Sequence, residues 1–158
     1  MKEDGKHMIV LESLKDFTLA SAKAVSWQGA GVRFSDNALT AMRAAREAFE
    51  ALLEDPDVVI YGVTSGYGQN AKFRLPPEER KRHSSNLPIE TAVSWGDPLP
   101  DRVARAIVFA RLANFVEGHA AVSPAIAEAV AAMLDAPAQP AIPTRGQGGA
   151  GEILSLSH

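Results

Sequence analysis

The fold class is decided by the stretch SDNALTAMRAAREAFEALLEDP, residues 35–56. Ser35 is a favourable N-cap, and Asp36 adds a negative charge to the first turn, where the helix dipole favours it. Apolar side chains then recur at spacings of three and four, which is the period of one helical face. This stripe consists of Leu39, Met42, Ala45, Phe49, Leu52 and Leu53. Because the residue before a proline avoids the α region, Asp55-Pro56 ends the segment, and we predict a helix with one face toward a core.

An extended segment and a glycine loop follow this helix. Val58-Val59-Ile60-Tyr61 is a mostly β-branched run that predicts a strand or an extended segment. It leads into GVTSGYGQN, residues 62–70, whose three glycines disfavour both a helix and a strand. We therefore predict a loop over residues 62–70.

Further helices are predicted on both sides of this region. They cover residues 11–25, 77–85, 101–117 and 125–134. Pro77 suits the first turn of its helix, and Gly118 suits the residue that terminates the next one. Glycine- and proline-rich stretches separate the helical patterns. The sequence therefore predicts a mainly α domain with short extended segments and glycine-rich loops.

The composition excludes several classes of protein. The chain has 158 residues, 46% hydrophobic and 22% charged, which is typical of a soluble globular domain. A net charge of -3 argues against a nucleic-acid surface. There is no cysteine, so disulfides and zinc–thiolate sites are excluded, and no apolar run reaches the roughly 18 residues of a membrane helix. We expect a cytoplasmic protein without a nucleic-acid or membrane partner.

The two ends of the chain are predicted separately from its body. Residues 1–8 are polar and lack the apolar segment of a signal peptide, so we predict a flexible N-terminus or an expression remnant. Residues 9–158 form the predicted domain. Glu152 suits the start of a last helix, which the sequence leaves after one or two turns. Such a helix has little to pack against, so we expect truncation, processing or a second polypeptide that continues the fold.

Residues 146–151, GQGGAG, formally match the dinucleotide-binding pattern G-x-G-x-x-G. That pattern needs a preceding strand, a following helix and an acidic residue about 20 positions further on. Pro140 and Pro143 precede this loop and the sequence ends too soon, so a nucleotide-binding domain is only a minor alternative. The four histidines lack metal-ligand spacing, and we predict no metal site.

Tyr61 is the residue most suited to proton chemistry. It stands at the junction of an extended segment and a glycine loop, where a ligand can approach the backbone closely. A tyrosine acts as a base only where its surroundings favour the ionised form. A packed core tyrosine is the alternative that the residues alone leave open.

Four segments, in the same order, resemble motifs of the ammonia-lyase and aminomutase family that acts on aromatic amino acids. Residues 61–68 resemble its Tyr-Gly-Val-Asn-Thr-Gly-Phe-Gly signature, and residues 86–99 its Asn-Leu…Gly-x-Pro-Leu segment. Residues 111–118 resemble its Arg-Leu-Asn…Gly helix. Residues 143–158 resemble its segment Pro-x-x-Gly-Ser-Val-Gly-Ala-Ser-Gly-Asp-Leu-Ala-Pro-Leu-Ser-His. Over residues 8–158 the chain therefore resembles the N-terminal part of a histidine/phenylalanine ammonia-lyase.

The resemblance implies a mainly helical fold, a homotetramer and the elimination of ammonia from an aromatic L-amino acid such as histidine, phenylalanine or tyrosine. In the family, an Ala-Ser-Gly triad cyclises and dehydrates to methylidene-imidazolone, an electrophile that activates the substrate. By position, Gly149, Ala150 and Gly151 occupy this triad. The tyrosine that matches Tyr61 acts as a base in the elimination.

The chain departs from the family at the residue that forms the electrophile. Serine loses its hydroxyl as water, whereas Ala150 has no such leaving group, so we predict that this cofactor is absent. Thr91 stands where the family has a histidine that helps to bind substrate, which argues against histidine selectivity. The predicted catalytic residues are Tyr61, Gly149, Ala150 and Gly151, and the predicted substrate-binding residues are Gly62, Gly68 and Thr91.

Two functions are compatible with this sequence. The first is a carbon–nitrogen lyase of which this chain is one part, because the family's later substrate-binding residues are not in it. The second is a non-catalytic assembly module that keeps the scaffold and has lost the chemistry. Both imply a homo-oligomer or a second polypeptide, and the first also implies a small amino acid substrate.

Overall fold

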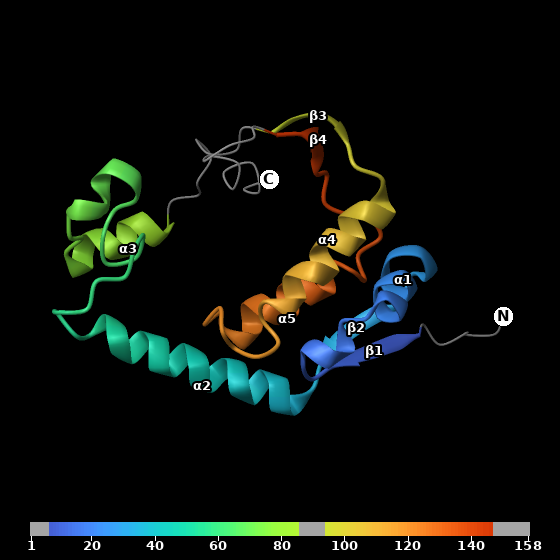
Figure 1. Cartoon of the computed structure of the whole chain (residues 1–158), viewed down its shortest axis with the longest axis horizontal. Helices are drawn as coiled ribbons and strands as arrows, with labels where there is room; N and C mark the ends of the chain where they lie inside the picture. The colour runs from blue at the N-terminus through green and yellow to red at the C-terminus, as the bar shows by residue number, and fades with distance from the viewer. Residues whose placement is uncertain (1–6, 86–93, 147–158) are drawn as a thin grey trace. The chain divides into compact units, whose positions relative to one another are not determined.

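The computed structural model describes residues 7–85 and 94–146 (Figure 1). By their contacts, the residues fall into two compact units. The first unit consists of Met1–Glu47 and Trp95–Arg145, and the second of Ala48–Ser94 and Gly146–His158. Within the described ranges, no helix is both long and apolar enough to cross a membrane.

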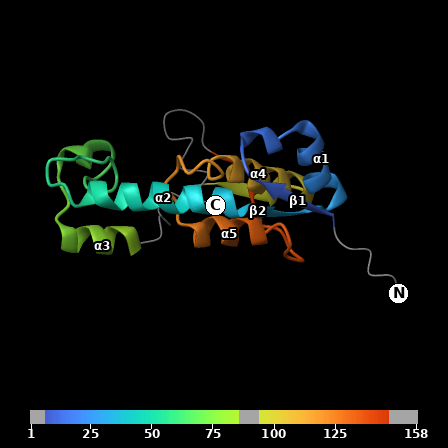
Figure 2. The ribbon, with the colours of Figure 1, turned by 90° about the horizontal axis from the view of Figure 1, so that it is seen from below.

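The first unit is built of helices and two small sheets. In chain order, its elements are β1 (Met8–Leu11), the 3-10 helix η1 (Leu14–Asp16), α1 (Leu19–Gln28), β2 (Gly31–Phe34), the start of α2 (Asp36–Leu53), β3 (Trp95–Pro98), α4 (Asp101–Ala113), α5 (Pro124–Ala132) and β4 (Pro143–Arg145). Strand β1 pairs in parallel with β2, and β3 pairs antiparallel with β4. Helix α4 packs against both α1 and α5 (Figures 1 and 2).

The start of the chain differs from the predicted helix over residues 11–25. Leu11 is the fully buried last residue of β1, a strand that begins at Met8, inside the segment predicted to be flexible. Helix α1 begins only after Thr18, whose hydroxyl accepts a hydrogen bond from the Ser21 amide at 3.1 Å while the Ser21 hydroxyl accepts from the Thr18 amide at 2.8 Å. This capping box fixes the start of α1. Residues 8–11 form a strand because β2 supplies a partner that the local pattern does not reveal.

The core of the first unit is one apolar cluster. Its larger members are Leu11, Val25, Val32, Phe34, Met42, Val108, Phe109, Leu112, Phe115, Val116 and Leu134. Beyond α4 the chain turns at Gly118, whose φ is 76°. A Cβ at Gly118 would lie 2.9 Å from the Cβ of Ala45, so only glycine lets this turn approach α2 so closely.

A partly buried arginine joins three points at which the chain turns in the first unit. The guanidinium of Arg105, on α4, donates to the carbonyl oxygens of Val25 at 2.7 Å, Ala30 at 3.0 Å and Leu134 at 2.6 Å. Val25 lies near the end of α1, Ala30 just before β2, and Leu134 just after α5. Helix ends leave carbonyl groups without intrahelical partners, and a guanidinium has five N–H donors, so one side chain can satisfy all three.

The second unit contains the end of α2, the 3-10 helix η2 (Gly68–Lys72) and α3 (Pro77–Ser85). The predicted helix that starts after Ser35 is confirmed as α2, and the Ser35 hydroxyl accepts a hydrogen bond from the Ala38 amide at 3.1 Å. Residues 58–60, predicted to be a strand or an extended segment, form neither a helix nor a strand in the described part of the chain. The structure is mainly helical with short extended segments, which confirms the predicted fold class.

Replacing Arg105 by lysine should lower the stability of the protein. Lysine keeps the charge but cannot reach three carbonyl groups with one planar group, so buried acceptors lose their donors. We expect the free energy of unfolding to fall by about 2–4 kcal/mol in a denaturant titration. The matched control is Arg102→Lys, an exposed position on the same helix, which should change stability by less than about 0.5 kcal/mol. Equal losses in the two variants would contradict the role of Arg105.

Candidate active-site loop

Tyr61, the predicted base, opens the turn that joins residues 58–60 to the glycine loop. The amides of Val63 and Thr64 both donate to the carbonyl oxygen of Ile60, at 3.1 and 2.9 Å. Gly62 adopts a φ of 71°, a left-handed conformation that glycine takes without strain. The chain can therefore reverse immediately after Tyr61.

Two buried hydroxyl groups lie inside the loop. Thr64 and Ser65 are each 1% exposed. Thr64 Oγ1 accepts a hydrogen bond from the Ile60 amide at 2.8 Å and donates to the carbonyl oxygen of Val58 at 3.4 Å. Ser65 Oγ donates to the carbonyl oxygen of Gly66 at 3.0 Å. These hydrogen bonds offset the cost of removing both hydroxyls from water.

Residues 73–75 close the loop from the other side. The Leu75 amide donates to the carbonyl oxygen of Thr64 at 2.9 Å, and the Gly66 amide donates to that of Phe73 at 3.2 Å. A Cβ at Gly66 would lie 2.7 Å from the carbonyl oxygen of Asn70. Only glycine therefore fits where η2 passes the loop.

Two arginines hold the frame around the loop. The Arg74 guanidinium donates to the carbonyl oxygen of Pro56. The Arg80 guanidinium, on α3, donates to the carbonyl oxygens of Leu75 at 2.8 Å and Leu53 at 3.1 Å. The end of α2, the loop and α3 are therefore joined by side-chain donors as well as by the chain itself.

The Tyr61 side chain projects out of this frame. It is 65% exposed, so packing within the described chain does not hold it, contrary to the packed-core alternative. Its hydroxyl oxygen accepts a hydrogen bond from the Gly68 amide at 2.9 Å. An aligned amide donor stabilises negative charge on the oxygen that it faces, and a tyrosine must carry that charge before it can take a proton. The geometry therefore suits Tyr61 to proton abstraction.

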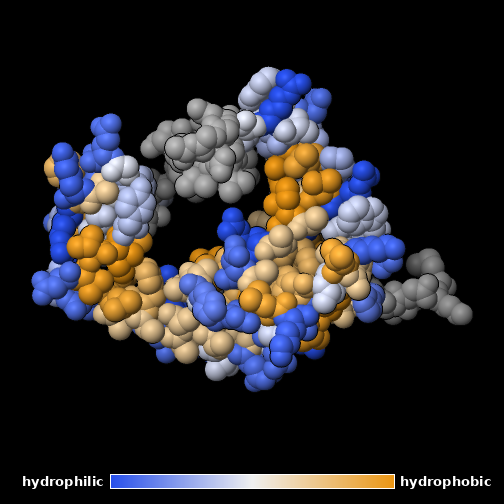
Figure 3. Space-filling model, viewed as in Figure 1, coloured by the Kyte–Doolittle hydropathy of each residue, from blue (hydrophilic) through white to orange (hydrophobic). Residues whose placement is uncertain are grey.

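The surface beside the Tyr61 hydroxyl is open to a ligand. A Cβ built on Gly68 would meet no heavy atom within 4 Å. Figure 3 shows apolar residues on the surface of the second unit. The large exposed apolar and aromatic side chains of that unit are Leu52, Val59, Tyr61, Tyr67 and Phe73. The structure thus brings three predicted site residues, Tyr61, Gly62 and Gly68, onto one accessible loop.

The other predicted site residues, Thr91 and Gly149–Ala150–Gly151, lie outside the described residues. The described residues that flank them are paired with each other. Trp95 lies opposite Arg145 in the β3–β4 ladder, and the guanidinium carbon of Arg145 is 4.8 Å from the Trp95 ring centroid. In the described ranges, no group of three or more acidic, histidine or cysteine side chains could hold a metal ion.

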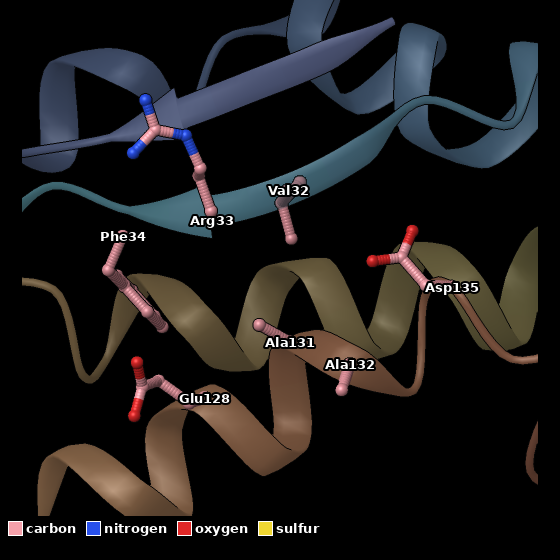
Figure 4. Close-up of a pocket in the computed structure, with 7 residues that line it drawn as sticks. All are labelled: Val32, Arg33, Phe34, Glu128, Ala131, Ala132 and Asp135. Atoms are coloured by element: carbon pink, nitrogen blue, oxygen red, sulfur yellow. The ribbon is translucent and has the colours of Figure 1, made fainter. Parts of the chain in front are cut away.

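A pocket of about 210 Å³ lies in the first unit (Figure 4). It is lined by Val32, Arg33, Phe34, Glu128, Ala131, Ala132 and Asp135. Figure 4 shows Val32 and Phe34 of β2 facing α5, with the Glu128 and Asp135 carboxylates toward the two ends. The sequence patterns did not identify this pocket, because it forms between elements that are distant along the chain.

Sequence reasoning also missed the residues that support Tyr61. Thr64 is the clearest, because its hydroxyl binds the backbone just before Tyr61. One signal was present: Thr64 occupies the position of an asparagine in the family signature, and both residues can bond to nearby backbone. Arg80 gave no signal, since its charged neighbours indicate an exposed helix face.

Comparison with known proteins agrees with this fold. The family described as aromatic amino acid lyase matches residues 17–158. Histidine ammonia-lyase of Paracidovorax citrulli (strain AAC00-1) is 32% identical over 142 residues, covering 89% of this chain and 28% of that protein. The histidine ammonia-lyase of Streptococcus pyogenes serotype M5 is 31% identical over 145 residues, covering 91% and 28%.

Solved structures show the same architecture. The tyrosine aminomutase from Streptomyces globisporus superimposes with a TM-score of 0.76 at 27% identity, covering 96% of this chain and 28% of that one. Ergothionase from Treponema denticola, an ergothioneine-degrading enzyme, superimposes with a TM-score of 0.78 at 24% identity, covering 89% and 28%. The latter likeness concerns the fold alone.

The mainly helical fold and the Tyr61 loop define an aromatic amino acid lyase scaffold. Because the family match covers residues 17–158, this chain belongs to the aromatic amino acid lyase family. It spans about 28% of the length of the curated relatives cited above.

Proposed function

We propose that this chain contributes the base-bearing loop of a carbon–nitrogen lyase that acts on an amino acid with an aromatic side chain. The observation that carries the proposal is the exposed Tyr61 phenol, whose oxygen is held by the Gly68 amide at 2.9 Å. Family membership supports the substrate class, since the related proteins are amino acid lyases and aminomutases.

The proposed step is an elimination. Tyr61 in its phenolate form takes a proton from the carbon next to the amine-bearing carbon and becomes a neutral phenol. The electrons of the broken C–H bond form a carbon–carbon double bond, and the C–N bond breaks as the amine leaves with its electron pair. Before the transfer, the Gly68 amide stabilises the negative charge on the phenolate oxygen.

The family's methylidene-imidazolone does not fit the residues of this chain. Its exocyclic methylene requires a serine that loses water, and Ala150 has no hydroxyl to lose. The elimination proposed for this chain therefore proceeds without methylidene-imidazolone. Without covalent activation, the nitrogen must leave from a positively charged form. A fully alkylated ammonium group keeps that charge at every pH, so it is a better leaving group here than a primary amine.

Tyr61→Phe tests the proposed base. The substitution removes one hydroxyl and keeps the ring. We expect turnover by the assembled protein, meaning this chain in its oligomer or with its partner polypeptide, to fall by about a hundredfold or more. The melting temperature should change little. Turnover is measured as formation of the unsaturated acid from aromatic L-amino acids and their N-trimethyl derivatives. Unchanged turnover would remove Tyr61 from the mechanism. A large loss of thermal stability without a rate effect would make Tyr61 a packing residue.

A non-catalytic assembly module is the second candidate function, and Ala150 is the observation that favours it. In this alternative the family scaffold persists as a homo-oligomer or as one subunit beside a second polypeptide. This alternative is favoured if the protein turns over none of the aromatic L-amino acids and none of their N-trimethyl derivatives. For either function we propose a cytoplasmic location, which cell fractionation tests.

Intact-mass spectrometry tests the predicted absence of methylidene-imidazolone. Because Ala150 cannot dehydrate, the purified chain should have its unmodified mass, and no water should be missing from residues 149–151. The same measurement identifies any polypeptide that co-purifies with this chain. A loss of one water located at residues 149–151 would show that an unexpected electrophile forms.

A further inference from the structure

We propose that Thr64 is the positioning residue for Tyr61, an inference that rests on the proposed function. Tyr61 is a base with little packing around it, since its side chain is 65% exposed. Its direction must therefore be set by hydrogen bonds, one to its hydroxyl group and others to the backbone from which the side chain extends. The Gly68 amide holds the hydroxyl oxygen at 2.9 Å, which leaves the backbone end to be fixed by another group.

Thr64 fixes that backbone end through the residue before Tyr61. The Ile60 amide donates to Thr64 Oγ1 at 2.8 Å, and the Ile60 carbonyl oxygen accepts from the Thr64 amide at 2.9 Å. Both polar backbone groups of Ile60 are thus bound to one residue. Thr64 Oγ1 also donates to the carbonyl oxygen of Val58 at 3.4 Å. Rotation of the chain leading into Tyr61 would break these hydrogen bonds.

Thr64 is itself held from the opposite side. It is 1% exposed, and its carbonyl oxygen accepts from the Leu75 amide at 2.9 Å. The carbonyl oxygen of Leu75 in turn accepts from Arg80 on α3 at 2.8 Å. A continuous set of hydrogen bonds therefore runs from α3 through Leu75 and Thr64 to Ile60, the residue before Tyr61.

Ser65 provides a matched control within the same loop. It is buried to the same degree as Thr64 and also carries a hydroxyl. Its hydroxyl, however, donates at 3.0 Å to the carbonyl oxygen of Gly66, the next residue along the chain, rather than to one of residues 58–60. Loss of the Ser65 hydroxyl should therefore affect loop stability without redirecting Tyr61.

Thr64→Val removes the hydroxyl and keeps the shape of the side chain. Because a misplaced base costs rate far more than affinity, we expect kcat of the assembled protein to fall between about ten- and a hundredfold with KM little changed. Thr64→Ser should restore most of the turnover, and Ser65→Ala should retain it. Thr64→Ala is the second variant if Thr64→Val does not fold. Equal losses in Thr64→Val and Ser65→Ala would overturn the proposal, because general loop packing would then explain both.

Hydrogen exchange at the Gly68 amide separates this inference from the proposed function. Tyr61→Phe removes the acceptor of that amide, so its exchange should become faster, and Thr64→Val should have the same effect if it lets Tyr61 move. If Tyr61→Phe abolishes turnover but Thr64→Val changes neither turnover nor exchange, the positioning role fails and the proposed function stands. If Tyr61→Phe leaves turnover intact, the proposed function fails, and slow exchange in Thr64→Val would then also overturn the positioning of Tyr61.

Discussion

The first unit depends on one arginine side chain, Arg105, which donates hydrogen bonds to three carbonyl groups. The Arg105 guanidinium joins the last turn of α1, the residue before β2 and the second residue after α5, with donor–acceptor distances of 2.6–3.0 Å. Val25 lies in the last turn of α1, Ala30 before β2 begins and Leu134 after α5 has ended. At such positions helix and strand ladders leave carbonyl groups without a regular donor. Val25, Ala30 and Leu134 belong to the apolar cluster, and the guanidinium offsets the cost of burying their carbonyl groups.

In the second unit, other side chains bind the backbone groups that lack regular hydrogen-bond partners. Its glycine-rich loop contains few regular backbone hydrogen bonds, and buried hydroxyls and arginines supply the missing partners. Thr64 binds the chain before Tyr61, while Arg80 binds the segments on either side of the loop. Side-chain donors hold a loop in shape without covering its surface, so the Tyr61 phenol can be both accessible and directed. That combination is what a base acting on a small molecule requires.

The sequence predicted those parts of the fold and site that local patterns control. Helix α2 was predicted closely because a cap, a regular apolar period and a proline all act within one segment. Strand β1 was missed because Met8–Leu11 is short and its partner β2 comes after an intervening helix. Tyr61 was identified from its motif, but its exposure and its hydrogen bond to Gly68 depend on how the loop folds back. The bridging role of Thr64 requires three-dimensional positions that no spacing rule supplies.

We propose that Tyr61 removes a proton from the carbon next to the amine-bearing carbon, in a protein whose Ala150 cannot form the family's electrophile. The most direct test compares turnover of an aromatic amino acid derivative with hydrogen and with deuterium at that carbon, using the assembled protein. With both hydrogens of that carbon replaced by deuterium, we predict slower turnover, an unsaturated product that keeps one of the two deuteriums, and turnover about a hundredfold lower, or less still, when Tyr61 is replaced by phenylalanine. Equal turnover by the Tyr61→Phe variant, with the same isotope effect, would contradict Tyr61 as the base.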